Sequence, residues 1–246
     1  MKNLKTKAVR RDQRSNPIPE DVSAVKGLKS EDGSYSVVQN RPMNDAFIRS
    51  SFHRNVLQRF HASPDALVID ELGLSHGRCR ADIAIVNGRL AGFEIKSDQD
   101  SLIRLSAQIK FYNAVFDHVT IIVGRKHAEA ILALVPKWWG IVVGHSCAKH
   151  GVRFDTLRSP TSNERVEPYA VAQLLWRNEA SSVLEKLGEP ASILRQRRSA
   201  LYERLAAILT LSELRQTVTS CLKRRKNWRS RGPRPPGDDS CLPGAM

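Results

Sequence analysis

The spacing of apolar positions changes several times between residues 44 and 158, and each change predicts a new element. Asn44 or Asp45 can cap a helix, and apolar residues then recur at helical spacing over 45–60. Short runs that alternate or remain apolar come next and predict strands. The predicted strands are 66–72, 80–86, 89–97, 118–124, 138–144 and 151–157.

Turn and helix signals place these strands in order. Asn87-Gly88 stands between the second and third strands and is a strong signal for a tight hairpin. A helix capped by Asp98 or Asp100 follows, because five apolar residues then recur three or four positions apart. These five are Leu102, Leu105, Ile109, Tyr112 and Phe116. With a further helix over 125–136, the order predicts an α/β fold with a mixed sheet.

From Glu167 onward the pattern is helical only, with predicted helices over 169–188, 191–209 and 212–225. This helical C-terminal unit is either a DNA-binding bundle or an α-helical cover for the sheet, and we favour the cover. The whole chain is thus divided into four parts. They are a disordered basic segment (1–42), an α/β domain (43–160), the helical unit (161–222) and a disordered basic tail (223–246).

Charge bears on the class of partner. The net charge is +14, and residues 1–42 hold nine lysines and arginines against five acids. Such a balance favours a polyanionic partner, which is nucleic acid or an anionic membrane surface. The alternative is that the basic tails only keep the protein in solution. No apolar run approaches the length of a membrane span, so we expect no membrane partner. The four cysteines form no CxxC pair, which argues against zinc and fits a reduced, cytoplasmic protein.

Three charged residues interrupt the predicted hairpin. Asp82 lies in the second strand, and Glu94 and Lys96 lie in the third. Because strand side chains alternate, a tight turn at 87–88 would place all three on one face. Ala84 and Gly92 are small neighbours there and predict room for an ion or a phosphate. Two carboxylates suit a divalent cation such as Mg²⁺.

These residues resemble the core motif of the PD-(D/E)xK nuclease superfamily, with Ala81 in place of its nominal proline. The resemblance implies a restriction-endonuclease-like αβββαβ core. It also implies that Asp82, Glu94 and the carbonyl of Ile95 bind Mg²⁺ or Mn²⁺, while Lys96 assists phosphodiester hydrolysis. The helix at 45–60 lacks the glutamate found in many members. Glu71 is therefore either a third metal ligand or an exposed strand-end residue.

The helix after the third strand extends the resemblance. Gln108 and Tyr112 lie one turn apart and are similar to the QxxxY motif of the RecB-like branch. There the glutamine helps to position the site, whereas Tyr112 is either peripheral to the site or part of the core. Residues 44–220 also resemble a bacterial family of endonuclease-like proteins known mainly from genome sequences.

Several basic residues are candidates for nucleic-acid contact. Arg78 and Arg80 stand in the loop before Asp82, where they either bind phosphate or belong to a solvated loop. Arg104 precedes Gln108 by one turn, and Tyr112 is a further candidate.

The sequence thus predicts a metal-dependent nuclease, with DNA favoured over RNA. The absence of a Walker A motif excludes the common nucleotide site, and the absence of GxSxG argues against a serine hydrolase. Two alternatives stay open. One is a nucleic-acid-binding module that does not cut, and the other is a structural protein in which these charges form an internal salt-bridge cluster.

Overall fold

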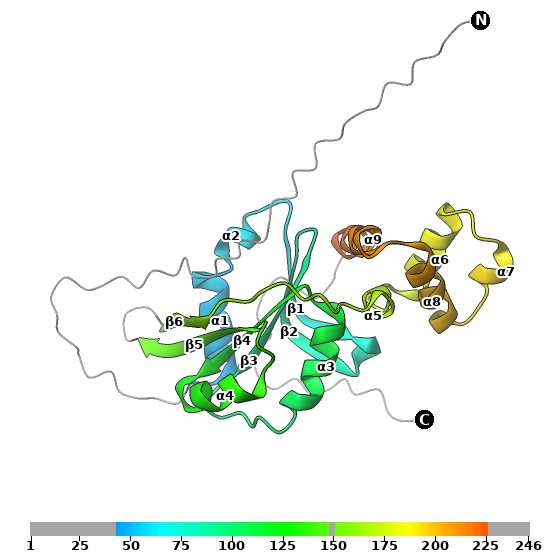
Figure 1. Cartoon of the computed structure of the whole chain (residues 1–246). Coiled ribbons are helices and arrows are strands. Elements are labelled where there is room, and N and C mark those ends of the chain that lie inside the picture. The colour runs from blue at the N-terminus through cyan, green and yellow to red at the C-terminus, as the bar shows by residue number, and fades with distance from the viewer. Residues whose placement is uncertain (1–42, 148–150, 226–246) are drawn as a thin grey trace, which may run out of the picture.

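The computed structural model describes residues 43–147 and 151–225 (Figure 1). The predicted basic segment 1–42 and positions 226–246 of the predicted tail lie outside this described part. Within it, one six-stranded sheet has the order β1-β2-β3-β4-β5-β6, so neighbours in sequence are also neighbours in the sheet. The predicted α/β fold with a mixed sheet and a helical C-terminal region is confirmed.

All six predicted strands are present, with ends that differ by a few residues. They are β1 Leu67–Leu74, β2 Cys79–Val86, β3 Leu90–Lys96, β4 His118–Gly124, β5 Gly140–Cys147 and β6 Gly151–Arg158. The first three strands pair antiparallel, β3, β4 and β5 run parallel, and β6 is antiparallel to β5. The carboxyl ends of the parallel strands therefore meet at one end of the sheet.

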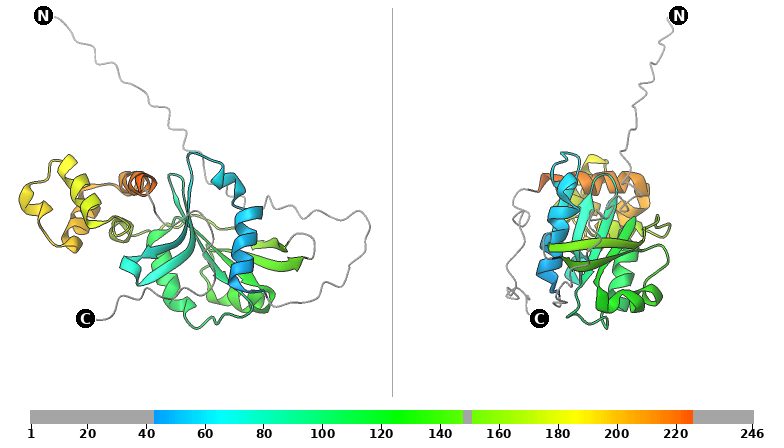
Figure 2. Two further views of the ribbon diagram at one scale, coloured as in Figure 1. Left: turned by 180° about the vertical axis from the view of Figure 1, so that it is seen from behind. Right: turned by 90° about the vertical axis from the view of Figure 1, so that its left-hand side faces the viewer.

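Helices cover both faces of the sheet (Figures 1 and 2). Helix α1 (Asp45–Asn55) packs Ile48 and Phe52 onto one face, and the short α2 (Gln58–His61) follows it. Helix α3 (Leu105–Val115) and helix α4 (Ala128–Leu134) contribute to the core on the other face. The sheet thus separates an α1-side core from an α3-side core.

Helix α3 begins later than the sequence predicts. Asp98 and Asp100 were expected to cap it, but the Asp100 carboxylate accepts hydrogen bonds from the backbone and the hydroxyl of Ser97, at 2.7 and 2.6 Å. Asp98 accepts from the backbone of Lys126 at 3.1 Å. Both aspartates therefore fix the loop after β3, and the helix begins only at Leu105.

Strand β1 changes the face to which its side chains point. Ile69 and Leu72 both belong to the α3-side core, although strict alternation would place them on opposite faces. Glu71 lies between them with φ of 56°, in the left-handed region, and the pairing with β2 omits it. Glu71 was expected at the end of this strand but lies inside it, at a distortion that such a residue adopts only at an energetic cost.

The helical C-terminal unit is more divided than its sequence predicts. Each of the first two predicted helices is broken in two, and only the last is continuous. The elements are α5 Pro168–Ala172, α6 Arg177–Lys186, α7 Ala191–Leu194, α8 Arg198–Ile208 and α9 Leu211–Arg224. The first break occurs because the Glu179 carboxylate accepts from the Trp176 backbone at 2.7 Å, which starts a new helix there.

This unit does not lie flat on the sheet as a cover. Figures 1 and 2 show α6, α7 and α8 as a lobe to one side, with α5 beside α3 and α9 across one end of the sheet. Its apolar residues, such as Tyr202 and Leu214, are continuous with the α3-side core. Within the described ranges, no helix is both long enough and apolar enough to cross a membrane.

Candidate active site

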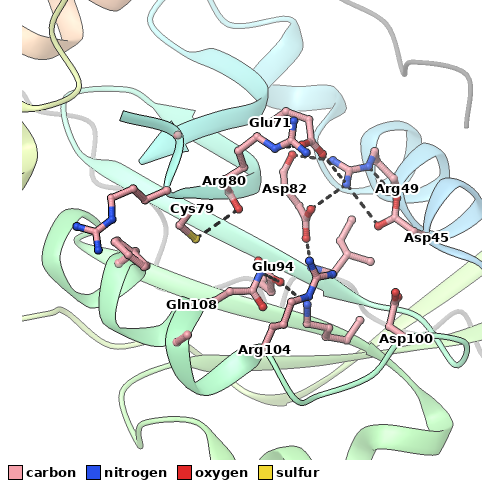
Figure 3. A pocket seen from close by; sticks show the side chains of 16 residues that line it. Asp45, Arg49, Glu71, Cys79, Arg80, Asp82, Glu94, Asp100, Arg104 and Gln108 are labelled. Carbon is pink, nitrogen blue, oxygen red and sulfur yellow. Dashed lines mark hydrogen bonds and ion pairs between the residues drawn. The ribbon is translucent and has the colours of Figure 1, made fainter. Parts of the chain in front are cut away.

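A pocket of about 510 Å³ opens between α1, the first three strands and α3 (Figure 3). Nine of the ten residues proposed from the sequence line it, although they are spread over 38 positions of the chain. They are Glu71, Arg78, Arg80, Asp82, Glu94, Ile95, Lys96, Arg104 and Gln108. The tenth, Tyr112, lies in the core directly behind Glu94.

The β2–β3 register brings the two predicted metal ligands together. The last paired residues are Ile83 and Phe93, so Asp82 and Glu94 are the next step of the hairpin. The ladder does not continue there. Instead, the Asp82 side-chain Oδ2 accepts from the Ile95 backbone N–H at 2.6 Å. Because a side chain replaces the backbone acceptor, the strands separate at this point, where the pocket begins.

Glu94 is almost fully buried, with 1% of its surface exposed. Its Oε1 lies 2.6 Å from the Lys96 Nζ and accepts from the Gln108 Nε2 at 2.7 Å. Its Oε2 accepts from the Tyr112 hydroxyl. Three donors hold the carboxylate in place and satisfy the hydrogen-bonding need of a buried polar group. They also leave part of its acceptor capacity open, because a carboxylate has about four lone-pair sites.

Tyr112 was a candidate for nucleic-acid contact, and its placement does not fit that role. Its side chain is fully buried among Phe116 and Trp139. Its hydroxyl reaches Glu94 and also accepts from the Asp82 backbone at 3.3 Å. Burial raises its pKa well above the usual value, and the Glu94 charge adds to the rise. Tyr112 therefore acts as a neutral donor that orients Glu94.

Arg49 and Asp45 of α1 were missed by the sequence reasoning. The Arg49 guanidinium donates to the Asp82 carbonyl at 2.6 Å and to its Oδ1 at 3.0 Å. Asp45 accepts from Arg49 at 3.1 Å and lines the pocket. The first helix thus does supply an acid, which the sequence presented only as a candidate cap. Arg49 had a weak signal, since it stands beside Ile48 on an otherwise apolar stripe.

The charges around Asp82 oppose one another. The pKa of Asp82 is raised to about 7: burial raises it most, the charge of Glu94 adds to the rise, and Arg49 opposes both effects. Burial lowers the pKa of Arg49, but the charges of Asp82, Asp45 and Glu71 raise it above its ordinary value overall. A second cation near Asp82 and Glu94 would relieve the remaining repulsion between the two carboxylates.

Glu71 holds the rim of the pocket. One carboxylate oxygen lies 3.2 Å from Arg49 and the other lies 3.2 Å from Arg80. Across the described residues, no group of three or more His, Cys, Asp or Glu side chains is arranged to hold a metal ion. The third ligand suggested for Glu71 is therefore not formed in this arrangement.

The space expected above Gly92 is filled. A Cβ placed on this residue would come within 2.6 Å of the Phe116 ring, which follows α3. The prediction that small residues leave room there was wrong, because an aromatic ring from the next helix occupies that room. The pocket lies farther along β3, at Glu94 and Lys96.

The oxygen ligands in the pocket fit Mg²⁺, a hard divalent cation that keeps several of its waters when a protein binds it. Asp82 and Glu94 supply two carboxylates in one pocket, and Mg²⁺ commonly uses one or two together with waters and phosphate oxygens. The buried Gln108 Oε1 has no hydrogen-bond partner within the described part of the chain. An acceptor left open beside Glu94 is suited to a water or a protonated amine.

Comparison with known proteins identifies the family. The sequence profile described as Bacteriophage P4 protein cII matches residues 42–231, which include every pocket residue and helices α1 to α9. The chain belongs to the bacteriophage P4 protein cII family. It is 32% identical to Protein cII of Enterobacteria phage P4 over 161 residues. That alignment covers 65% of this chain and 60% of the phage protein.

This family membership corrects the resemblance drawn from the sequence. Membership of the PD-(D/E)xK superfamily, or of the bacterial endonuclease-like family, was expected, but the match is to the P4 cII family. No solved structure matches the chain. The motif that carried the resemblance is short. Asp82, Glu94 and Lys96 all lie on one hairpin, and three residues there are too few to establish membership of a superfamily.

Proposed function

We propose that this protein of the P4 cII family is a metal-dependent nuclease that hydrolyses phosphodiester bonds, with DNA as the first substrate to test. The observation that carries the proposal is the pair of carboxylates, Asp82 and Glu94, held in one pocket with Lys96. Structural ion pairs alone do not require two acids whose charges repel each other.

Each residue has a role in this proposal. Mg²⁺ or Mn²⁺ held by Asp82, Glu94 and the Ile95 carbonyl would polarise a phosphate and lower the pKa of a bound water. Lys96 offsets negative charge beside Glu94, at 2.6 Å. Gln108 and Tyr112 keep the Glu94 carboxylate oriented.

The finer fold assignment is part of the same proposal. The order α1, β1, β2, β3, α3, β4 supports a restriction-endonuclease-like core, with the acids on the hairpin and the supporting residues on α3. Arg78, Arg80 and Arg104 on the pocket rim supply the positive charge that a phosphate backbone needs.

The test is cleavage and ion binding by the purified full chain. Labelled single-stranded DNA, duplex DNA and RNA are incubated with Mg²⁺ or Mn²⁺, and Mn²⁺ affinity is measured by calorimetry. We expect Asp82→Asn and Lys96→Met to lower cleavage by at least about 100-fold, the usual scale for one electrostatic group in a reacting site. Asp82→Asn also loses Mn²⁺ binding.

Asp70→Asn is the matched control, because Asp70 lies on β1 but pairs with His53 outside the pocket. It should cut like the wild type. Wild type and Asp82→Asn cutting equally, or neither cutting any substrate, would remove the basis of the proposal.

A second candidate is an internal ion-pair cluster without catalysis. It is favoured by the contacts of Arg49 with Asp82 and of Lys96 with Glu94, which already pair both acids. Under this alternative, Mn²⁺ does not bind, and Lys96→Met destabilises the fold instead of lowering an activity.

A further inference from the structure

Three arginines lie close together at the junction of α7 and α8. Arg195, Arg197 and Arg198 are all exposed. Arg204, in the same unit, pairs with Glu189 at 2.6 Å. Among the residues that the structure describes, no carboxylate lies within ion-pair distance of the three. Their guanidinium donors are therefore available to an external anion.

The backbone that carries these arginines is fixed. Arg177 of α6 donates from its guanidinium to the carbonyl of Leu194 at 3.3 Å and to that of Gln196 at 3.2 Å. These two bonds close the turn between α7 and α8. Because the turn is held, binding would order only the side chains and would cost less conformational entropy.

A contact between α8 and the β1–β2 turn joins this surface to the pocket. The His76 ring stacks on the Tyr202 ring of α8, with centroids 5.5 Å apart and planes 25° from parallel. Burial lowers the pKa of His76, and the nearby charge of Arg198 lowers it further. Gly77 and Arg78 follow directly and line the pocket. The stacked His76 and Tyr202 rings thus connect the arginines of the helical unit to the pocket rim.

We infer that Arg195, Arg197 and Arg198 bind the phosphate backbone of a nucleic acid that runs past His76 into the pocket. The inference rests on the proposed function and extends it, since it gives the helical unit a direct contact with the substrate. Arginine suits this role because its planar group donates to two phosphate oxygens at once. The sequence had favoured packing as the role of this unit.

The test is a triple variant of the full chain, Arg195→Gln/Arg197→Gln/Arg198→Gln. Fluorescence anisotropy measures binding to labelled DNA duplex, single strand and RNA in EDTA, over about 50 to 200 mM salt. Each lost phosphate contact lowers the slope of log K against log salt by about 0.9 on a duplex. We expect a slope reduced by about 2 to 3 and an affinity at least about 10-fold lower.

Arg89→Gln/Lys137→Gln/Arg165→Gln is the matched control. It removes the same charge from exposed positions, and Arg89 and Lys137 precede β3 and β5 at the end of the sheet opposite the pocket. A charge effect without a defined site would weaken both triple variants equally, and that result would overturn the inference. So would wild-type slope and affinity in the α8 variant, or no binding by the wild type.

The outcomes separate this inference from the proposed function. Binding in EDTA needs no cleavage, and the α8 variant should keep wild-type Mn²⁺ affinity because it leaves Asp82 and Glu94 intact. An active wild-type enzyme with unchanged binding in the α8 variant would sink only this inference. A protein that never cuts but loses binding in this variant would sink only the nuclease.

Discussion

At the scale of single residues, the buried carboxylate of Glu94 sets the chemistry of the pocket. Its three donors come from β3 and α3, namely Lys96, Gln108 and Tyr112. Of these, Tyr112 provides the cleanest test, because removing one hydroxyl keeps the ring and its packing against Trp139.

We expect Tyr112→Phe to lower the free energy of unfolding by about 1–3 kcal/mol, since a buried acceptor on Glu94 is left unsatisfied. Urea denaturation in EDTA measures this loss. Tyr169→Phe, in the helical unit and outside the pocket lining, is the control. A Tyr112→Phe protein as stable as wild type would show that the hydroxyl contributes nothing to holding Glu94.

Asp82 predicts a dependence of stability on pH. Burial raises its pKa from 3.8 to about 7, so between these values the folded state binds more protons than the unfolded state. Stability contributed by this group is therefore present below pH 4 and is lost as pH rises to about 7. In EDTA, Asp82→Asn should be more stable than wild type at pH 8 and not at pH 5.

Thermal unfolding at the two pH values measures this difference. Adding Mn²⁺ at pH 8 should stabilise the wild type but not Asp82→Asn, because the positive ion offsets the repulsion between the Asp82 and Glu94 carboxylates. A wild type that is already the more stable protein at pH 8 in EDTA would contradict the prediction.

At the scale of elements, β3 packs closely against Phe116, the residue that follows α3. Gly92 faces the Phe116 ring, and a methyl group there would come within 2.6 Å of it. Gly92→Ala should destabilise the protein by about 1–3 kcal/mol through overpacking. Chemical denaturation measures this change.

Gly73→Ala in β1 is the matched control, because its added Cβ meets nothing closer than 3.9 Å. We expect little change there. Equal stability of the two variants would mean that Phe116 moves aside without cost.

The same scale shows where sequence patterns were sufficient. All six strands were predicted, because β-branched runs and Asn87-Gly88 carry local signals. The breaks in the C-terminal helices were missed for two reasons. The Trp176–Glu179 cap is local but begins at a tryptophan, which is not a typical capping residue, and the Arg177 contacts join residues 17 and 19 positions apart.

At the scale of the whole molecule, helix α9 is linked to the end of the sheet by an ion pair. Arg215 contacts the buried Asp117, whose other oxygen accepts from the Leu90 backbone at 2.9 Å. Arg215→Met leaves a buried charge with one partner fewer and should cost about 3–5 kcal/mol.

Arg204→Met, which breaks the exposed Arg204–Glu189 pair, is the control and should leave stability unchanged. Thermal unfolding of both variants measures the contrast. A stable Arg215→Met protein would show that α9 does not depend on this pair.

The sequence by itself determined the strands, the hairpin and the residue types of the pocket, since these depend on local spacing and turn chemistry. The hairpin register was decided by the structure: Val86 pairs with Leu90, so the loop spans residues 87–89 and Asp82 stands opposite Glu94. A two-residue turn at Asn87-Gly88, as the sequence predicts, would have placed Asp82 opposite Phe93 instead. Only the tertiary structure decided that Arg49 and Asp45 join them, that Tyr112 lies behind Glu94, and that His76 meets Tyr202. These contacts join distant segments through packing, and nothing in the local pattern of either segment specifies its partner.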